Sequence, residues 1–163
     1  VLLGAGYSRK DITIYNASDY GAALISDGLA TTEKMIRERP DIVQKMVNGT
    51  IRGWQWGIYN GEEAAKIVLK FNPGLEYQKQ VYQVEETSKL VASRKALTEG
   101  LGYMDMKDWE VSQKGLLGVK AIDNKIDLSK AYTLKFWKNS PKKFRKLDNM
   151  DKVRKRWAKN LGE

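Results

Sequence analysis

The apolar residues that follow Pro40 constrain the fold more than any other part of the sequence. They recur at spacings of three and four, which places them on one face of a helix. The residues of this face are Ile42, Val43, Met46, Val47, Thr50, Ile51, Trp54 and Ile58. Pro40 suits the first turn of a helix, and Asp41 suits the positive end of its dipole. The segment therefore predicts a long amphipathic helix from Pro40 to about Ile58.

Helix signals also lie on both sides of this segment. Thr31 or Thr32 can cap a short helix that ends near Arg39, because the residue before a proline avoids helical geometry. Four later segments carry helical patterns: residues 60–71, 75–97, 105–118 and 127–132. The first of these is expected to open with a capping box at Asn60–Glu63. Its expected buried face consists of Ala64, Ile67, Val68 and Phe71.

Strand character is confined to the N-terminal stretch. Asp11–Tyr15 alternates and is rich in β-branched and aromatic residues, and a second short apolar run follows at Ala22–Ile25. No apolar stretch approaches the roughly 20 residues that a membrane-spanning helix needs, and no secretory signal pattern is present. The sequence predicts a helix-rich α/β fold, with short N-terminal strands followed by five to six helices.

Two residue types are missing from the sequence, cysteine and histidine. Their absence excludes disulfides, thiolate nucleophiles, iron–sulfur ligation, imidazole bases and imidazole-bound metals. There is also no phosphate-binding or dinucleotide-binding glycine motif, and the carboxylates occur in no paired or glycine-framed setting. We therefore expect a protein that is not an enzyme and that carries no cofactor or metal.

The net charge of +9 is concentrated near the C-terminus. Residues 135–163 hold eleven basic and three acidic side chains, a net charge of +8, whereas the other 134 residues carry a net charge of +1. Asn139–Pro141 interrupts this basic segment, and a helix is expected after it. One interpretation is a solvated terminal helix that docks an apolar stripe formed by Phe144, Leu147, Val153 and Trp157. The other is a basic tail that binds nucleic acid or an anionic membrane.

Several short segments occur in an order typical of one protein family. They are Asp27–Ile36, Arg39–Val43, Arg52–Trp54, Asn60–Ala65, Gly102–Trp109 and Ala131–Trp137. In this order they resemble the second half of the SsuA/THI5 (NMT1-like) solute-binding proteins of ABC transporters, the nitrate, sulfonate, taurine and thiamine-pyrimidine type. The chain departs from the family pattern at Gly61, where the family has proline, and at Tyr103, where it has tryptophan.

The resemblance implies part of a type II periplasmic-binding-protein-like fold, in which two α/β lobes joined by a hinge close on a small solute. It implies binding of a pyrimidine, a sulfonate or a related compound without chemistry, and delivery to an ABC permease. One branch of the family is enzymatic, but it consumes one of its own histidines and this chain has none. The implied location is periplasmic or extracellular and membrane-associated, with a signal peptide outside this chain.

The family's chains are about twice as long as this one, and only their second half is matched. We therefore expect either a fragment that lacks an N-terminal half or a domain that associates with itself or with another chain. The expected partial domain covers residues 1–137, with a hinge segment at 1–30 and a helical part at 31–137. Residues 138–163 are expected to form a separate basic helix or tail.

The hinge segment of the family matches Asp19, Tyr20, Gly21 and Asp27, so the resemblance implies that these residues line the solute cleft. An aromatic ring with neighbouring carboxylates suits a heteroaromatic or amine-bearing solute. In the alternative interpretation, Tyr20 is a packing residue and the two aspartates form turns or helix caps.

Trp54 and Trp56 offer a second place where an aromatic ligand could stack. Residues two apart on a helix point about 200° apart, so at most one of these rings can face the core with Ile51 and Ile58. Core packing is the expected role. Two functional hypotheses follow from the sequence: a solute-binding component of an importer, and a helical interaction protein that acts through its basic tail.

Overall fold

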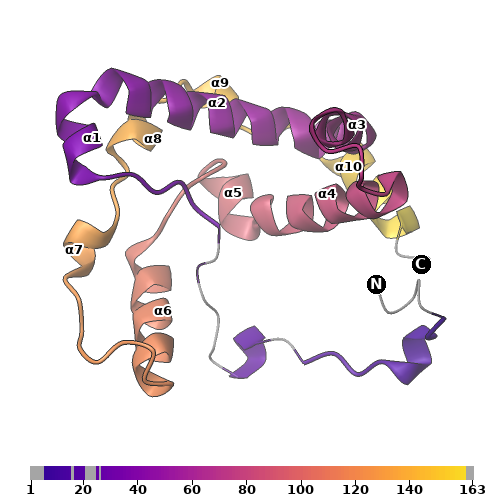
Figure 1. Cartoon of the computed structure of the whole chain (residues 1–163), viewed down its shortest axis with the longest axis horizontal. Coiled ribbons are helices and arrows are strands. Elements are labelled where there is room, and N and C mark those ends of the chain that lie inside the picture. Colours follow the sequence, from indigo (N-terminus) through magenta and orange to yellow (C-terminus); the bar gives the residue numbers. More distant parts are fainter. Residues whose placement is uncertain (1–5, 16, 21–24, 26, 161–163) are drawn as a thin grey trace. The chain divides into compact units, whose positions relative to one another are not determined.

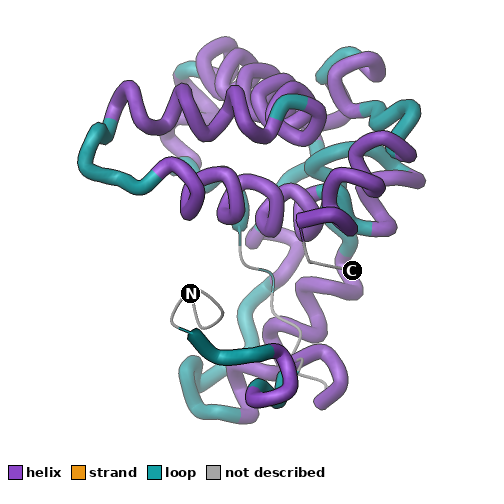
Figure 2. Tube along the Cα trace, turned by 90° about the vertical axis from the view of Figure 1, so that its right-hand side faces the viewer, coloured by secondary structure: helices purple, strands orange, loops and turns teal. Residues whose placement is uncertain are grey.

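The computed structural model describes residues 6–15, 17–20, 25 and 27–160, which form helices joined by loops (Figures 1 and 2). Two short 3-10 helices come first, η2 (Arg9–Asp11) and η3 (Ala17–Tyr20). The α-helices that follow in the described part are α1 (Glu33–Glu38), α2 (Pro40–Tyr59), α3 (Gly61–Phe71), α4 (Tyr77–Val91), α5 (Arg94–Thr98), α6 (Met106–Gly118), α7 (Leu128–Ala131), α8 (Lys135–Asn139), α9 (Lys142–Arg145) and α10 (Asp151–Asn160). The predicted helix-rich character is confirmed.

The chain divides into two compact units. Unit 1 consists of Val1–Gly28 and Asp105–Tyr132, and unit 2 consists of Leu29–Met104 and Thr133–Glu163. The chain therefore passes from one unit to the other three times. These boundaries differ from the expected division at residue 137, because residues 133–163 belong to the same unit as residues 29–104.

Unit 2 is built around α2, which packs against α1, α3, α4, α8 and α9 (Figure 1). The core cluster draws buried side chains from four parts of the unit, namely Ile51, Ile58, Ala92, Ala96, Leu101, Met150 and Val153. Ile51 and Ile58 come from the apolar face predicted for the helix that starts at Pro40. That face is less completely buried toward its start, where Met46 is 59% exposed.

The helix starts in this region follow the local signals in the sequence. The Thr32 side chain accepts a hydrogen bond from the Met35 amide and caps α1. The helix ends at Glu38, and Pro40 opens α2 with Asp41 in its first turn. The predicted cap, proline break and second helix are therefore confirmed.

The start of α3 differs from the prediction. Asn60 is the residue before α3, but its side chain makes no capping hydrogen bond to this helix. The side-chain amide of Asn60 donates instead to the carbonyl oxygen of Trp56 at 2.8 Å. The expected capping box is therefore wrong, because the Asn60 side chain satisfies the end of α2 rather than the start of α3. The α3 residues that are buried are Gly61 and Ala65, while Phe71 of the expected apolar face is 87% exposed.

The predicted single helix over residues 75–97 is two helices. Helix α4 ends at Val91, and α5 begins at Arg94 after Ser93, whose side chain accepts from the Ala96 amide. Serine competes with the helical backbone for hydrogen bonds and favours the cap of a new helix. The chain leaves this region through Gly100 and Gly102, both with positive φ angles that favour glycine.

The predicted strand at Asp11–Tyr15 is wrong. Asp11 ends η2, and its carboxylate accepts hydrogen bonds from the Ser8 amide and hydroxyl at 2.9 and 2.7 Å. These bonds hold the pKa of Asp11 below its ordinary value. Such a local turn competes with a strand, and among the described residues no segment offers a strand partner (Figure 2). Of the expected run Ala22–Ile25, only Ile25 lies within the described residues, in a loop.

Unit 1 is held by polar and aromatic contacts around α6. Asp105 caps this helix by accepting from the Lys107 amide at 2.7 Å. Ser112 is buried and accepts a hydrogen bond from the Ile25 amide at 2.9 Å, which joins the two sequence segments of the unit. The rings of Trp109 and Tyr132 stack with centroids 5.2 Å apart and an interplanar angle of 4°.

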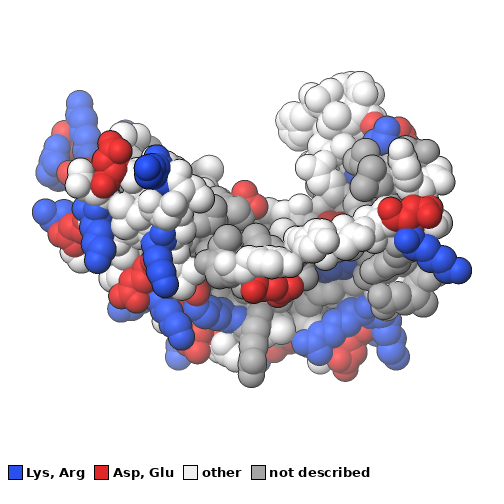
Figure 3. All heavy atoms as spheres, turned by 90° about the horizontal axis from the view of Figure 1, so that it is seen from below, with Lys and Arg blue, Asp and Glu red and all other residues white. Residues whose placement is uncertain are grey.

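The basic C-terminal segment folds as part of unit 2. It forms α8, α9 and α10 rather than one terminal helix. Val153 is buried, and Phe144, Leu147 and Trp157 pack against the core, so the expected apolar stripe does dock. On the face shown in Figure 3, Lys and Arg atoms lie interspersed with Asp and Glu atoms.

Arg156 of α10 bonds to two other helices, α2 and α4. Its guanidinium donates to the carbonyl oxygens of Ile58 and Tyr59, the last residues of α2, at 2.6 and 2.9 Å. It also pairs with Glu85 of α4, whose side chain is 1% exposed, with Nε 2.9 Å from Oε1. Gly61 at the start of α3 lies against the same carboxylate. We call Gly61, Glu85 and Arg156 the buried ion-pair cluster.

In the described part of the chain, no helix combines the length and the apolar character needed to cross a membrane.

Candidate functional site

The cleft residues implied by the resemblance all fall in unit 1. Asp19 and Tyr20 lie in η3, and both side chains are exposed. Asp27 is exposed in the loop that leads out of the unit, and it makes no hydrogen bond or ion pair to another described residue. Gly21 lies outside the described residues. The structure therefore brings Asp19 and Tyr20 together on one turn.

An aromatic pair accompanies Tyr20. The ring of Tyr15 lies with its centroid 6.3 Å from that of Tyr20, at an interplanar angle of 51°. Tyr15 is 74% exposed and Tyr20 is 70% exposed, so most of each side chain faces solvent. Tilted aromatic pairs of this kind are mutually attractive, and an exposed ring face remains available for a ligand. Tyr15 is not among the residues that the resemblance places in the cleft, because the alternation of Asp11–Tyr15 predicts a strand there.

The two tryptophans of α2 do not form a common stacking surface. Trp54 is half-buried, and Trp56 is 44% exposed. Ile51 and Ile58 on the same helix are buried in the core of unit 2. The expectation that at most one of the two rings faces the core agrees with this difference in burial.

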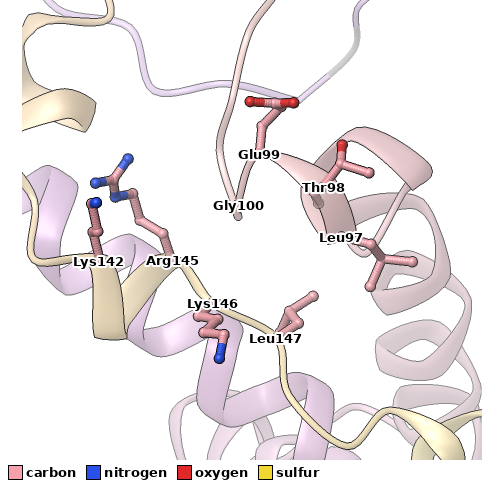
Figure 4. Close-up of a pocket in the computed structure, with 9 residues that line it drawn as sticks. Leu97, Thr98, Glu99, Gly100, Lys142, Arg145, Lys146 and Leu147 are labelled. Carbon is pink, nitrogen blue, oxygen red and sulfur yellow. The ribbon is translucent and has the colours of Figure 1, made fainter.

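A pocket of about 250 Å³ lies within unit 2, between the end of α5 and the region of α9 (Figure 4). Its apolar lining comes from Ala96, Leu97 and Leu147. Its polar lining comes from Thr98, Glu99, Gly100, Lys142, Arg145 and Lys146. Three cations and one carboxylate therefore surround a small cavity with an apolar part.

Arg145 is the most buried charged residue of this pocket, with 9% of its surface exposed. Its guanidinium carbon lies 4.0 Å from the centre of the Trp137 ring, a cation–π contact. The Trp137 indole donates to the carbonyl oxygen of Leu101 at 2.8 Å, which fixes the ring beneath the guanidinium. The Arg145 carbonyl in turn accepts from the Leu101 amide at 2.8 Å.

Gly100 permits this close approach. A Cβ atom at position 100 would lie 3.0 Å from the Cβ of Arg145 and 3.2 Å from its carbonyl oxygen, and the φ of Gly100 is +113°. Both conditions favour glycine at this position.

Among the described residues, Lys146 is the cation of this pocket that pairs with a carboxylate. Its ammonium lies 2.8 Å from the carboxylate of Asp148, and this bond raises the pKa of Lys146. The Asp148 carbonyl oxygen accepts from the Tyr59 hydroxyl at 2.5 Å, and burial raises the pKa of that tyrosine. These contacts tie the loop between α9 and α10 to α2.

The sequence of this chain matches one family model and one curated protein. The family model described as NMT1/THI5 like matches residues 4–64. The riboflavin-binding protein RibY of Chloroflexus aurantiacus is 28% identical over 118 residues, a match that covers 69% of this chain and 33% of that protein. The matched part is thus about a third of the length of that relative. No solved structure matches the chain significantly. Together these matches confirm the resemblance of this chain to the NMT1/THI5-like solute-binding proteins.

Proposed function

We propose that this chain is part of a solute-binding protein that binds a small heteroaromatic compound without converting it. The observation that most supports this is the family match at residues 4–64, which includes Asp19, Tyr20 and Asp27. The relative from Chloroflexus aurantiacus is named for binding riboflavin, a compound with a flat heteroaromatic ring system. We infer a ligand of that chemical class, a flavin or a pyrimidine.

The aromatic pair of unit 1 supplies a suitable surface for such a ligand. Tyr15 and Tyr20 are both largely exposed, so a flat ring system can stack on either face without disturbing a core. Asp19 lies on the same turn as Tyr20 and can accept hydrogen bonds from ligand N–H or O–H groups. This combination favours an uncharged heterocycle with donor groups over a simple anion such as nitrate or an alkanesulfonate.

The proposal also covers the fold, the location and the partner of the protein. The chain contributes to a type II periplasmic-binding-protein-like fold, in which residues 1–30 supply the hinge segment. The protein is exported and delivers its solute to an ABC permease. The absence of histidine and cysteine from the sequence is compatible with a role in binding rather than catalysis.

The first test is a titration of the protein with riboflavin, followed by the quenching of flavin fluorescence. A thermal-shift panel of pyrimidines, an alkanesulfonate, taurine and nitrate runs in parallel, because a ligand that binds the folded state raises the unfolding midpoint. We expect riboflavin or a pyrimidine to bind, and we expect the alkanesulfonate, taurine and nitrate to leave the midpoint unchanged. The proposal for this chain is contradicted if flavin fluorescence is not quenched and no heterocycle raises the unfolding midpoint.

The second test locates the binding surface. Tyr20→Leu and Tyr15→Leu are each expected to weaken heterocycle binding by about tenfold, since a stacked aromatic contact contributes about 1–3 kcal/mol. Tyr7→Leu is the matched control, because Tyr7 is also exposed in unit 1, at 55%, and is not part of the aromatic pair. Equal affinities for all three variants would place the ligand elsewhere.

A further inference from the structure

Two of the cations that line the pocket of unit 2 are Lys142 and Arg145. Lys142 and Arg145 are three residues apart on α9 and extend in the same direction (Figure 4). Among the described residues, no carboxylate forms an ion pair with either side chain, whereas Lys146 pairs with Asp148 at 2.8 Å. Like charges that share one side of a helix repel each other. An anion placed between them would remove that repulsion.

Arg145 provides an independent reason to expect an anion. Its side chain is buried, and its Nε has no hydrogen-bond partner among the residues that the structure describes. A buried charge is costly unless it is paired and its donors are satisfied. The Trp137 ring at 4.0 Å compensates part of that cost but accepts no hydrogen bond in the plane of the guanidinium. The guanidinium therefore retains unused donor capacity.

The guanidinium is also held in place before any ligand arrives. The backbone of Arg145 is bonded to Leu101, and the Trp137 ring below it is fixed by its bond to the same residue. A side chain that is already ordered loses little entropy on binding. The planar donor arrangement of arginine matches the oxygens of a carboxylate or a phosphate.

We propose that this pocket binds a small organic anion, with Lys142 and Arg145 contacting its carboxylate or phosphate group. Ala96, Leu97 and Leu147 contact the apolar part of the ligand. The volume of about 250 Å³ lies below the roughly 300–1,000 Å³ of pockets that enclose drug-sized ligands, so the ligand is small. This site lies within unit 2 and is independent of the solute site proposed for unit 1.

Glu99 allows a test in which the proposal predicts tighter rather than weaker anion binding. It also lines the pocket, and among the described residues it forms no ion pair. A carboxylate near an anion site weakens anion binding through repulsion, and removing its charge strengthens it. Glu99→Gln is therefore expected to tighten binding by about twofold to threefold at low salt.

The experiment is calorimetric titration of the full chain with butyrate and phenyl phosphate at low ionic strength. Butyramide serves as a probe that lacks the charge, and inorganic phosphate serves as a probe that lacks the apolar part. We expect one of the two organic anions to bind and both other probes to bind at least about tenfold more weakly, since a hydrogen bond to a charged group contributes more than a neutral one. A preference for butyrate or for phenyl phosphate identifies the headgroup. Absence of binding by both overturns the proposal.

A pair of variants tests whether the anion binds in this pocket. Lys142→Gln is expected to weaken anion binding by about fivefold to tenfold, because it removes a charge-assisted contact. Lys143→Gln is the matched control, since Lys143 is adjacent on α9, carries the same charge and does not line the pocket. Equal weakening by both variants would indicate general electrostatic attraction and overturn the site. Riboflavin is uncharged, so its binding in the first test is unaffected by Lys142→Gln and the two proposals can fail separately.

Discussion

Gly61 lies where a side chain would disturb the buried ion-pair cluster. A Cβ atom at this position would lie 2.0 Å from Oε1 of Glu85, a distance that no pair of non-bonded atoms tolerates. The carboxylate is 1% exposed and paired with Arg156, so it has little room to move. Glycine at the first position of α3 therefore has a packing reason, although the related family has proline there.

We expect Gly61→Ala to destabilise the protein by about 1–3 kcal/mol, because the displaced carboxylate loses part of its pairing in a buried site. Urea denaturation measures this change in the free energy of unfolding. The control is Gly53→Ala in α2, where a Cβ atom would meet no other atom within 4 Å. That variant is expected to gain about 0.5–1 kcal/mol from helix propensity. Equal stabilities for the two variants would contradict the proposed clash.

At the residue scale, the sequence predicts best where the determinant is local. Thr32 caps the helix predicted after it, and Asp105 caps the helix that begins the predicted segment 105–118, because a side-chain oxygen reaches amides only two or three residues away. Asn60 fails as a predicted cap because two helix ends meet there and its side chain bonds to the preceding one. The position of Glu85 opposite Gly61 depends on how α3 packs against α4 and has no local signal.

At the scale of a helix, α10 separates its charges by face. Val153 is 2% exposed and Arg156 reaches the end of α2, while Lys152, Arg154 and Lys155 are exposed. The cations of the C-terminal segment are therefore of two kinds. Within α10, Arg156 is structural, whereas Lys152, Arg154 and Lys155 can be replaced without removing a buried contact.

Arg156→Gln is expected to destabilise the protein by about 2–4 kcal/mol. The variant leaves the buried carboxylate of Glu85 without its cation, and the range is set below the roughly 3–5 kcal/mol of a fully buried pair because the Arg156 side chain is 28% exposed. Thermal and urea denaturation measure the loss.

The matched control changes the three exposed cations of the same helix, Lys152, Arg154 and Lys155, to glutamine. Stability is expected to stay within about 0.5 kcal/mol of the original. If this triple variant were as unstable as Arg156→Gln, net charge rather than the buried pair would be responsible.

The same triple variant also tests the alternative function of the basic segment. Binding of random duplex DNA that disappears only in the triple variant would favour that alternative.

The helices themselves could be predicted better than their packing. The 3.6-residue periodicity and Pro40 are sufficient to place α2, because both act within the helix. The buried face predicted for α3 is wrong, since Gly61 and Ala65 pack in the interior while the larger Ile67 and Phe71 remain exposed. Which face is buried depends on the partner helix. The anion pocket was missed for the same reason, because α5 and α9 are far apart in the sequence.

At the scale of the whole molecule, the two units differ in how they are stabilised. The buried apolar side chains of the described residues all belong to unit 2: Val43, Ile51, Ile58, Ala65, Ala92, Ala96, Leu101, Phe136, Met150 and Val153. In unit 1, the described contacts include hydrogen bonds and aromatic stacking around α6, an exposed tyrosine pair and an exposed ion pair between Asp127 and Lys130. Segments with few buried apolar contacts open at a lower free-energy cost.

Hydrogen exchange of the intact chain should therefore distinguish the units. We expect the amides of α6 to exchange at least about tenfold faster than those of α2 and α4, because local opening exposes them more readily. Peptide-level mass spectrometry after timed labelling provides the measurement. Protection of α6 equal to that of α2 would show that unit 1 opens only together with unit 2.

The chain alternates between its two units, and this order determines when the core of unit 2 can be completed during synthesis. Its helices α1 to α5 leave the ribosome early, but Met150 and Val153 belong to the same core and emerge only after all of unit 1 has been made. Until then, Ile51 and Ile58 lack part of their apolar surroundings. Contacts between segments distant in the chain form late and slowly, so the nascent chain exposes this unfinished core while α6 and α7 are being translated.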